Sequence, residues 1–97
     1  MLIGVPKEIK NNEYRVGLLP ASVKEFVHAG HEVIVETNAG ASIHATDEEY
    51  KKVGAKIAAN AKEVFDKADM IIKVKEPQPE ECAMLRKGQV LFTYLHL

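Results

Sequence analysis

The stretch PASVKEFVHAGHEVIVE, residues 20–36, decides the fold of this 97-residue chain. Pro20 suits the first turn of a helix, where a missing N–H loses no partner. Val23 and Phe26 then begin an apolar stripe with the spacing of one helix face. A glycine typical of a helix end separates this stripe from Glu32–Glu36, a run of β-branched residues that favours a strand. The stretch therefore predicts a helix that leads straight into a strand.

The same alternation continues on both sides of this stretch. Further strands are predicted at Leu2–Val5, at 55–58, at Asp69–Lys75 and at Gln89–Tyr94. Helices are predicted to begin at Pro20, at Thr46 with a capping box, at Asn60 and at Pro79, the last running to about Arg86. We therefore expect one α/β domain of Rossmann-like or flavodoxin-like type, with a mostly parallel sheet and helices on both faces.

The composition excludes several classes of protein. The net charge is −1 with both signs interspersed, so there is no basic surface for nucleic acid. The apolar runs are far shorter than the ~20 residues that span a bilayer, and the opening residues do not form a secretory signal. Cys82 is the single cysteine, which excludes an internal disulfide and fits a reducing compartment. We expect a cytoplasmic protein with no nucleic-acid or membrane partner.

Three ionisable residues are predicted to lie at one edge of the sheet, at or beyond the carboxyl ends of its strands. Arg15 lies in the loop after the first strand, Lys75 ends the strand Asp69–Lys75, and His96 stands just past Gln89–Tyr94. Ligands of parallel sheets gather beyond the carboxyl ends of the strands. The three residues therefore suggest a site for an anionic ligand. The alternatives are a solvated arginine, an ordinary lysine at a strand end and a packed histidine.

Two further patterns bear on the chemistry. Lys73 shares a strand face with Lys75, and a lysine inside a buried strand requires a partner. The sequence contains no G-x-G-x-x-G, so we expect no cofactor-binding residues in this chain. No cluster of residues has the spacing of metal ligands, so no metal site is predicted either.

Three separated motifs carry a resemblance to a known family. They are IGVPKEIKNNEYRVGLLP (3–20), DMIIKVKEPQPEE (69–81) and GQVLFTYLHL (88–97), with GHEVIVETNAGA (30–41) also in place. Together they resemble the amino-terminal part of bacterial alanine dehydrogenases, and the likeness runs through essentially all 97 residues. Family members are several-fold longer. The resemblance implies that residues 1–97 are the amino-terminal part of a catalytic (substrate) domain, and that the NAD-binding domain is absent from this chain.

The resemblance also implies an activity and roles for the three residues. The reaction is the oxidative deamination of L-alanine by NAD and water to pyruvate, ammonium and NADH, a step of L-alanine catabolism. Arg15 would hold the substrate carboxylate, Lys75 would contact the carboxylate and the reacting carbonyl, and His96 would be the general acid/base. These residue types suit bidentate carboxylate binding, stabilisation of negative charge on oxygen and proton transfer near neutral pH. The family further implies a cytoplasmic homohexamer that binds NAD mainly through the absent domain.

Three alternatives remain open. The amino-terminal domain of nicotinamide nucleotide transhydrogenase is similar in its opening motif but lacks counterparts of Lys75 and His96. Saccharopine dehydrogenase of the lysine-forming type keeps a lysine and a histidine, with a different pattern around the histidine. The third is a non-catalytic binding or oligomerisation module. On any reading we expect the isolated 97 residues to be inactive, and to associate through the exposed strand at 89–94.

Overall fold

The structure, a computed structural model, describes residues 1–10 and 13–94. In this part of the chain five strands form one sheet in the order β3-β2-β1-β4-β5, and every pairing is parallel. The strands are β1 (Leu2–Val5), β2 (Glu32–Glu36), β3 (Lys56–Ala58), β4 (Met70–Lys73) and β5 (Val90–Thr93). The predicted parallel α/β fold is confirmed.

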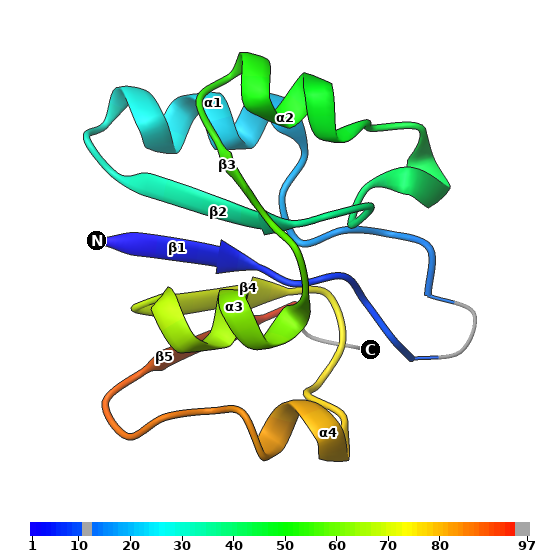
Figure 1. The fold of residues 1–97 in the computed structure, drawn as a ribbon, viewed down its shortest axis with the longest axis vertical. Coiled ribbons are helices and arrows are strands. Elements are labelled where there is room, and N and C mark those ends of the chain that lie inside the picture. The colour runs from blue at the N-terminus through cyan, green and yellow to red at the C-terminus, as the bar shows by residue number, and fades with distance from the viewer. Residues whose placement is uncertain (11–12, 95–97) are drawn as a thin grey trace.

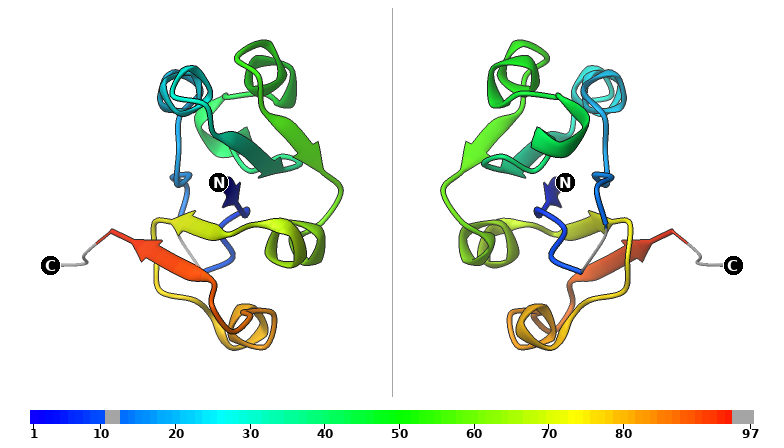
Figure 2. Two further views of the ribbon diagram at one scale, coloured as in Figure 1. Left: turned by 90° about the vertical axis from the view of Figure 1, so that its left-hand side faces the viewer. Right: turned by 90° about the vertical axis from the view of Figure 1, so that its right-hand side faces the viewer.

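Helices cover both faces of this sheet (Figure 1 and Figure 2). The α-helices of the described residues are α1 (Pro20–His28), α2 (Asp47–Lys52), α3 (Ala61–Lys67) and α4 (Pro79–Cys82), with a short 3-10 turn η1 (Ala41–Ile43). One hydrophobic core lies under α1 and α2, where Val23 and Tyr50 are fully buried. A second core lies on the opposite face under α3, around Val64 and Phe65. Two apolar layers on one sheet account for the buried strands between them.

The stretch that decides the fold behaves as its pattern predicts. The helix begins at Pro20 and ends at His28, and β2 has the predicted bounds. Gly30, with a φ of +94°, makes the turn between them, a conformation that other residues adopt only under strain. The three middle residues of β2 are buried because this strand lies between β1 and β3 with a helical layer on each face.

The predicted caps are present at the starts of α2 and α3. The hydroxyl of Thr46 accepts the N–H of Glu49 at 3.2 Å, and the Glu49 carboxylate accepts the N–H of Thr46 at 3.3 Å. The amide oxygen of Asn60 accepts the N–H of Glu63 at 2.9 Å. Each cap satisfies a backbone donor that a helix leaves without an intrahelical partner. The sequence therefore fixes where these two helices begin.

Two predicted ends are wrong by more than one residue. The last helix, α4, stops at Cys82 instead of continuing to about Arg86. The residues after it bind α3: the Arg86 guanidinium donates to the carbonyl oxygens of Phe65 and Ala68, at 3.1 and 2.6 Å. Strand β4 stops at Lys73, where its pairing with β5 ends, so Lys75 lies beyond the strand. Both corrections come from contacts between segments distant in sequence.

The strand order places the switch point of the sheet beside β1. From β1 the chain first builds β2 and β3 on one side, then crosses to build β4 and β5 on the other. Loops that leave β1 and β4 at their carboxyl ends therefore diverge at this point, where open α/β sheets bind their ligands. Arg15 and Lys75 lie on these two connections. The fold thus places both predicted residues at its expected ligand-binding edge.

Candidate functional site

Arg15 is held by the carboxylate of Glu13, two residues before it. The guanidinium donates through Nε to Oε2 and through Nη2 to Oε1, both at 3.1 Å, and the backbone N–H of Arg15 also donates to Oε2, at 2.9 Å. A bidentate pair of this kind fixes the plane of a guanidinium. These hydrogen bonds from Arg15 also hold the pKa of the Glu13 carboxyl below its usual value. Glu13 is therefore ionised at neutral pH.

Lys75 approaches the same carboxylate from the connection after β4. Its Nζ lies 3.9 Å from Oε1 of Glu13, the atom that also accepts from Arg15. The Glu13 side chain is only 3% exposed and that of Lys75 13%, whereas that of Arg15 is 65% exposed. The structure thus brings together two of the three residues that the sequence singled out. His96, the third, lies outside the described residues.

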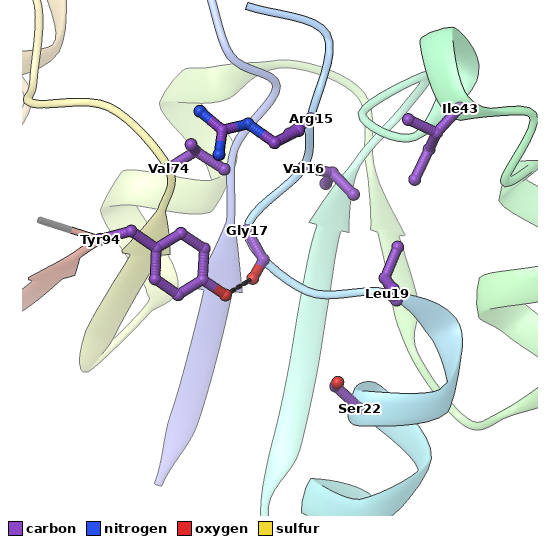
Figure 3. Close-up of a pocket in the computed structure, with 8 residues that line it drawn as sticks. All are labelled: Arg15, Val16, Gly17, Leu19, Ser22, Ile43, Val74 and Tyr94. Carbon is purple, nitrogen blue, oxygen red and sulfur yellow. Dashed lines mark hydrogen bonds between the residues drawn. The ribbon is translucent and has the colours of Figure 1, made fainter. Parts of the chain in front are cut away.

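A cavity of about 290 Å³ opens beside Arg15, between the loop before α1 and the ends of β4 and β5. Figure 3 shows its lining, which consists of Arg15, Val16, Gly17, Leu19, Ser22, Ile43, Val74 and Tyr94. The Tyr94 hydroxyl donates to the carbonyl oxygen of Gly17 across this cavity. Most of the lining is apolar, and Arg15 is the one charged residue that the described part of the chain contributes to it. A small anion with an apolar substituent fits such a surface.

The loop before α1 is fixed against the sheet by two contacts. Gly17 packs so closely on β4 that a Cβ at this position would collide with the backbone carbonyl of Ile72. The buried hydroxyl of Tyr50, in α2, donates to the carbonyl oxygen of Leu18 at 2.7 Å, and burial raises the pKa of Tyr50 to about 12. These contacts hold the loop that carries Arg15 in one place over the switch point.

A buried ionic cluster lies directly beneath Lys75. Lys73 donates to Oε1 of Glu8 at 2.8 Å, and its Nζ lies 3.4 Å from Oε1 of Glu81. The three side chains are 1–2% exposed. Burial raises the pKa of the Glu81 carboxyl above its usual value. The sequence predicted that Lys73 requires a partner but did not identify Glu8 or Glu81.

A second ion pair lies at the rim. Lys10 binds Glu76, which follows Lys75 directly, and this hydrogen bond lowers the pKa of the Glu76 carboxyl to about 2. Both side chains are substantially exposed, so the pair is screened by solvent. It links the loop after β1 to the connection after β4 on the solvent side of the buried cluster.

Sequence reasoning missed the acidic residues of this edge. Glu8 and Glu13 stand in the polar run KEIKNNEYR, which reads as a solvated loop. The one signal that points to them is charge balance: cations predicted to lie at a strand end require nearby carboxylates. Tyr94 was included in the predicted strand at 89–94 but lies just past β5, and no role was foreseen for it.

Other features of the described residues do not extend this site. Among the described residues, no group of His, Cys, Asp and Glu side chains is arranged to hold a metal ion. None of the described helices has the length and apolar character to cross a bilayer. His44 lines a second cavity of about 410 Å³ together with Asn38 and Asp47. None of these features adds a charged group to the edge where Arg15 and Lys75 meet.

Comparisons with known proteins identify the family of this chain. Residues 4–97 match the family model described as alanine dehydrogenase/PNT, N-terminal domain. The alanine dehydrogenases of Methanococcus maripaludis and Bacillus subtilis are 63% and 57% identical over all 97 residues, which cover 26% and 25% of those proteins. The chain therefore spans about a quarter of the length of the curated relatives it matches.

Solved structures give the same result. An L-alanine dehydrogenase superposes with a TM-score of 0.94 at 51% identity, over 99% of this chain and 26% of that one. A transhydrogenase from Sinorhizobium meliloti superposes with a TM-score of 0.90 at 34% identity, over 98% of this chain and 28% of that one. This chain belongs to the family of alanine dehydrogenase/PNT N-terminal domains.

Proposed function

We propose that this chain carries the substrate-binding half of the active site of an NAD-dependent L-alanine dehydrogenase. In that protein, L-alanine, NAD⁺ and water give pyruvate, ammonium, NADH and a proton. The observation that carries the proposal is the convergence of Arg15 and Lys75 on one oxygen of Glu13, at the switch point of the sheet. The high identity to alanine dehydrogenases supports the choice of substrate.

The charges of the site favour a carboxylate ligand. Arg15 and Lys75 contribute two positive charges and Glu13 one negative charge, so the group has a net charge of +1. The cluster beneath it holds one cation, Lys73, and two carboxyl groups, Glu8 and Glu81, but it is enclosed by protein and does not line the cavity. A substrate carboxylate that enters the cavity beside Arg15 balances the excess charge, and the guanidinium can bind it through two N–H groups.

Each residue has a distinct part in the proposed reaction. Arg15 holds the carboxylate and so fixes the position of the α-carbon. Lys75 donates to the oxygen of the reacting carbonyl and stabilises the negative charge that develops there as the carbinolamine forms or collapses. His96 transfers protons to and from the oxygen and the nitrogen, a role that the family resemblance assigns and that a pKa near neutrality suits. The apolar walls around Arg15 accommodate the methyl group of the substrate.

The described residues do not fit the nicotinamide cofactor. None of the loops that follow the strands contains the glycine-rich sequence that lets a pyrophosphate approach the backbone. We therefore assign NAD binding to the part of the relatives that this chain does not cover. The homohexamer and the cytoplasmic location implied by the family are part of the same proposal.

The test is a substrate panel with the full-length protein. We expect NADH to be consumed when pyruvate and ammonium are both present, and NAD to be reduced when L-alanine is supplied. Absence of both reactions, in a protein that binds NADH, would reject the proposal.

A second candidate function is hydride transfer between nicotinamide nucleotides. One observation favours it, the close superposition on a transhydrogenase at 34% identity. The same protein preparation therefore needs an assay of hydride transfer between NADH and an NADP analogue. Saccharopine should be included in this panel as the substrate of saccharopine dehydrogenase, the other enzyme that the sequence resembles. Because Lys75 and His96 are present, we expect no transhydrogenation. We expect no reaction with saccharopine either, because the pattern around His96 differs from that of saccharopine dehydrogenase.

A further inference from the structure

We infer that Glu8 and Lys73 are positioning residues that hold the backbone of Val74 and Lys75, and so set the place of the Lys75 ammonium at the substrate site. The inference rests on the proposed function of that site, because it assumes that Lys75 meets the substrate. Neither Glu8 nor Lys73 lines the cavity beside Arg15. Both lie below it and act through the segment that carries Lys75.

Glu8 binds this segment through two backbone donors. Its Oε2 accepts the N–H of Val74 at 2.9 Å, and its Oε1 accepts the N–H of Lys75 at 3.2 Å. The two residues come after the last pairing of β4 with β5, so no strand formed by the described residues supplies these acceptors. The Glu8 carboxylate, from the loop after β1, therefore accepts the two backbone N–H groups that a neighbouring strand would otherwise bind. Buried N–H groups without such an acceptor would destabilise the fold.

Lys73 binds both the Glu8 carboxylate and the backbone carbonyl of Lys75. Its Nζ donates to Oε1 of Glu8 at 2.8 Å and to the carbonyl oxygen of Lys75 at 3.1 Å, and it lies 3.4 Å from Oε1 of Glu81. Three oxygens thus surround an ammonium group that has three protons to donate. The carbonyl of Lys75 is bound to Lys73, and its N–H is bound to Glu8. Both backbone polar groups of Lys75 are fixed by buried side chains.

Glu81 links this arrangement to the next helix. Its Oε1 also accepts the N–H of Gln78 at 2.8 Å, the residue that precedes α4. The connection from β4 to α4 is therefore bound at both ends to the same buried cluster. One ammonium and two carboxyl groups meet in this cluster, so Lys73 is the only cation of the three and can balance only one ionised carboxylate.

Stability alone does not explain a cluster of this kind. Removing charges from water is costly, and apolar side chains of similar volume commonly stabilise a core equally well or better. Hydrogen bonds, unlike apolar contacts, fix direction and distance. Here they fix the two residues whose geometry decides where the Nζ of Lys75 lies relative to Arg15 and Glu13. Misplacement of a reacting group by about 1 Å can cost on the order of a hundredfold in rate.

The experiment uses Glu8→Gln in the full-length protein. An amide keeps the size of the side chain but presents one acceptor and one donor to a site with two backbone donors. We expect kcat/KM for pyruvate to fall about tenfold, the loss of roughly one charge-assisted hydrogen bond, while KM for NADH changes less than about twofold. We also expect faster hydrogen exchange at the amides of Val74 and Lys75, a readout that requires no turnover.

Glu8→Asp is the second variant, because it keeps the charge that Lys73 requires and only shortens the reach to the two N–H groups. We expect it to unfold at a higher temperature than Glu8→Gln and to show the same direction of change in both readouts. Asp47→Asn is the matched control. Asp47 also accepts a backbone N–H just after a strand, that of Asn38 after β2, at 2.9 Å. Its pyruvate kinetics should match those of the unaltered protein.

A Lys75→Gln background separates a positioning role from a merely structural one. If Glu8 acts through Lys75, adding Glu8→Gln to Lys75→Gln weakens pyruvate binding to the NADH complex by less than about twofold. Equal losses in the two backgrounds, or unchanged exchange at Val74 and Lys75, would overturn the inference. A wild-type protein that binds NADH but not pyruvate would instead reject the proposed function, and hydrogen exchange would still decide whether Glu8 holds the segment.

Discussion

Arg15 and Lys75 approach the same atom, Oε1 of Glu13, from two different connections, at 3.1 and 3.9 Å. The loop after β1 supplies Arg15, and the connection after β4 supplies Lys75. The two cations are thus brought within reach of one anion before any substrate enters. Mutual repulsion of the cations is offset by Glu13, and the remaining positive charge is available to a ligand.

Arg15→Lys tests the assignment of the carboxylate site. A lysine keeps the charge but cannot form the two parallel hydrogen bonds of a guanidinium. In the full-length protein we expect KM for pyruvate to rise about tenfold to a hundredfold, with a smaller effect on kcat, as steady-state kinetics can show. If both constants are unchanged, Arg15 does not bind the substrate carboxylate.

His96→Ala tests the proton-transfer step. Loss of a well-placed acid/base group typically costs about 10²–10⁴-fold, so turnover should fall by at least that much. Pyruvate should still bind the NADH complex, because the carboxylate is held by other residues. Fluorescence titration of bound NADH measures this binding without turnover. A variant with nearly normal turnover would remove His96 from the mechanism.

The pH dependence of the Lys10–Glu76 pair has a defined sign. Lys10 lowers the pKa of Glu76 to about 2, below the unfolded value of about 4.3, so the pair stabilises the folded state above that value. The contribution is lost as the pH falls toward about 2. NMR titration of the side-chain carboxyl of Glu76 should give a midpoint near 2 at low salt. The midpoint should return toward the ordinary glutamate value in Lys10→Gln.

Gly17→Ala tests how the loop before α1 is held against β4. A methyl group here collides with the backbone carbonyl of Ile72, so we expect a loss of about 1–3 kcal/mol in the free energy of unfolding. Gly30→Ala is the control, since its Cβ meets nothing within 4 Å and only the positive φ is unfavourable. We expect Gly17→Ala alone to raise KM for pyruvate, because Arg15 lies on the same loop. Equal KM values for the two variants would contradict this.

The isolated 97-residue chain is predicted to associate through β5. This strand lies at the edge of the sheet, and Leu91, Phe92 and Tyr94 are 37%, 52% and 43% exposed. Open edges with apolar side chains invite pairing with another chain. Sedimentation should show concentration-dependent oligomers that Phe92→Lys weakens. Ile9→Lys, at another exposed apolar position, is the control and should leave the oligomers intact. A monomer at all concentrations would disprove this prediction.

The sequence predicted the parts of the fold that depend on local patterns. The spacing of apolar residues located β2 and α1, and cap residues located the starts of α2 and α3. It failed where distant segments decide the outcome. The last helix is shorter than predicted because Arg86 binds the end of α3, and β4 ends early where its pairing with β5 stops. The residues next to each of these positions in the sequence do not predict either contact.

The candidate site likewise contains residues that the sequence predicted and residues that it did not. The rule that ligands gather at strand ends placed Arg15 and Lys75 at one edge, and the structure shows them there. Glu8 and Glu13 were missed because a glutamate in a polar loop is usually solvated. Their burial follows from contacts with the connection after β4, which only the folded chain reveals. The sequence pointed to Glu8 only indirectly, because a buried lysine requires a counterion.

The bond between Glu8 and Lys73 joins residues separated by 65 positions in the chain. During synthesis, Glu8 is made early, yet its counterion arrives only after β2 and β3 have been added. A growing chain that has not reached β4 would have to bury an unpaired carboxylate to close this edge, so the edge should stay open and hydrated until then. On the ribosome, the ligand-binding edge would therefore form later than the part of the sheet built from β1, β2 and β3.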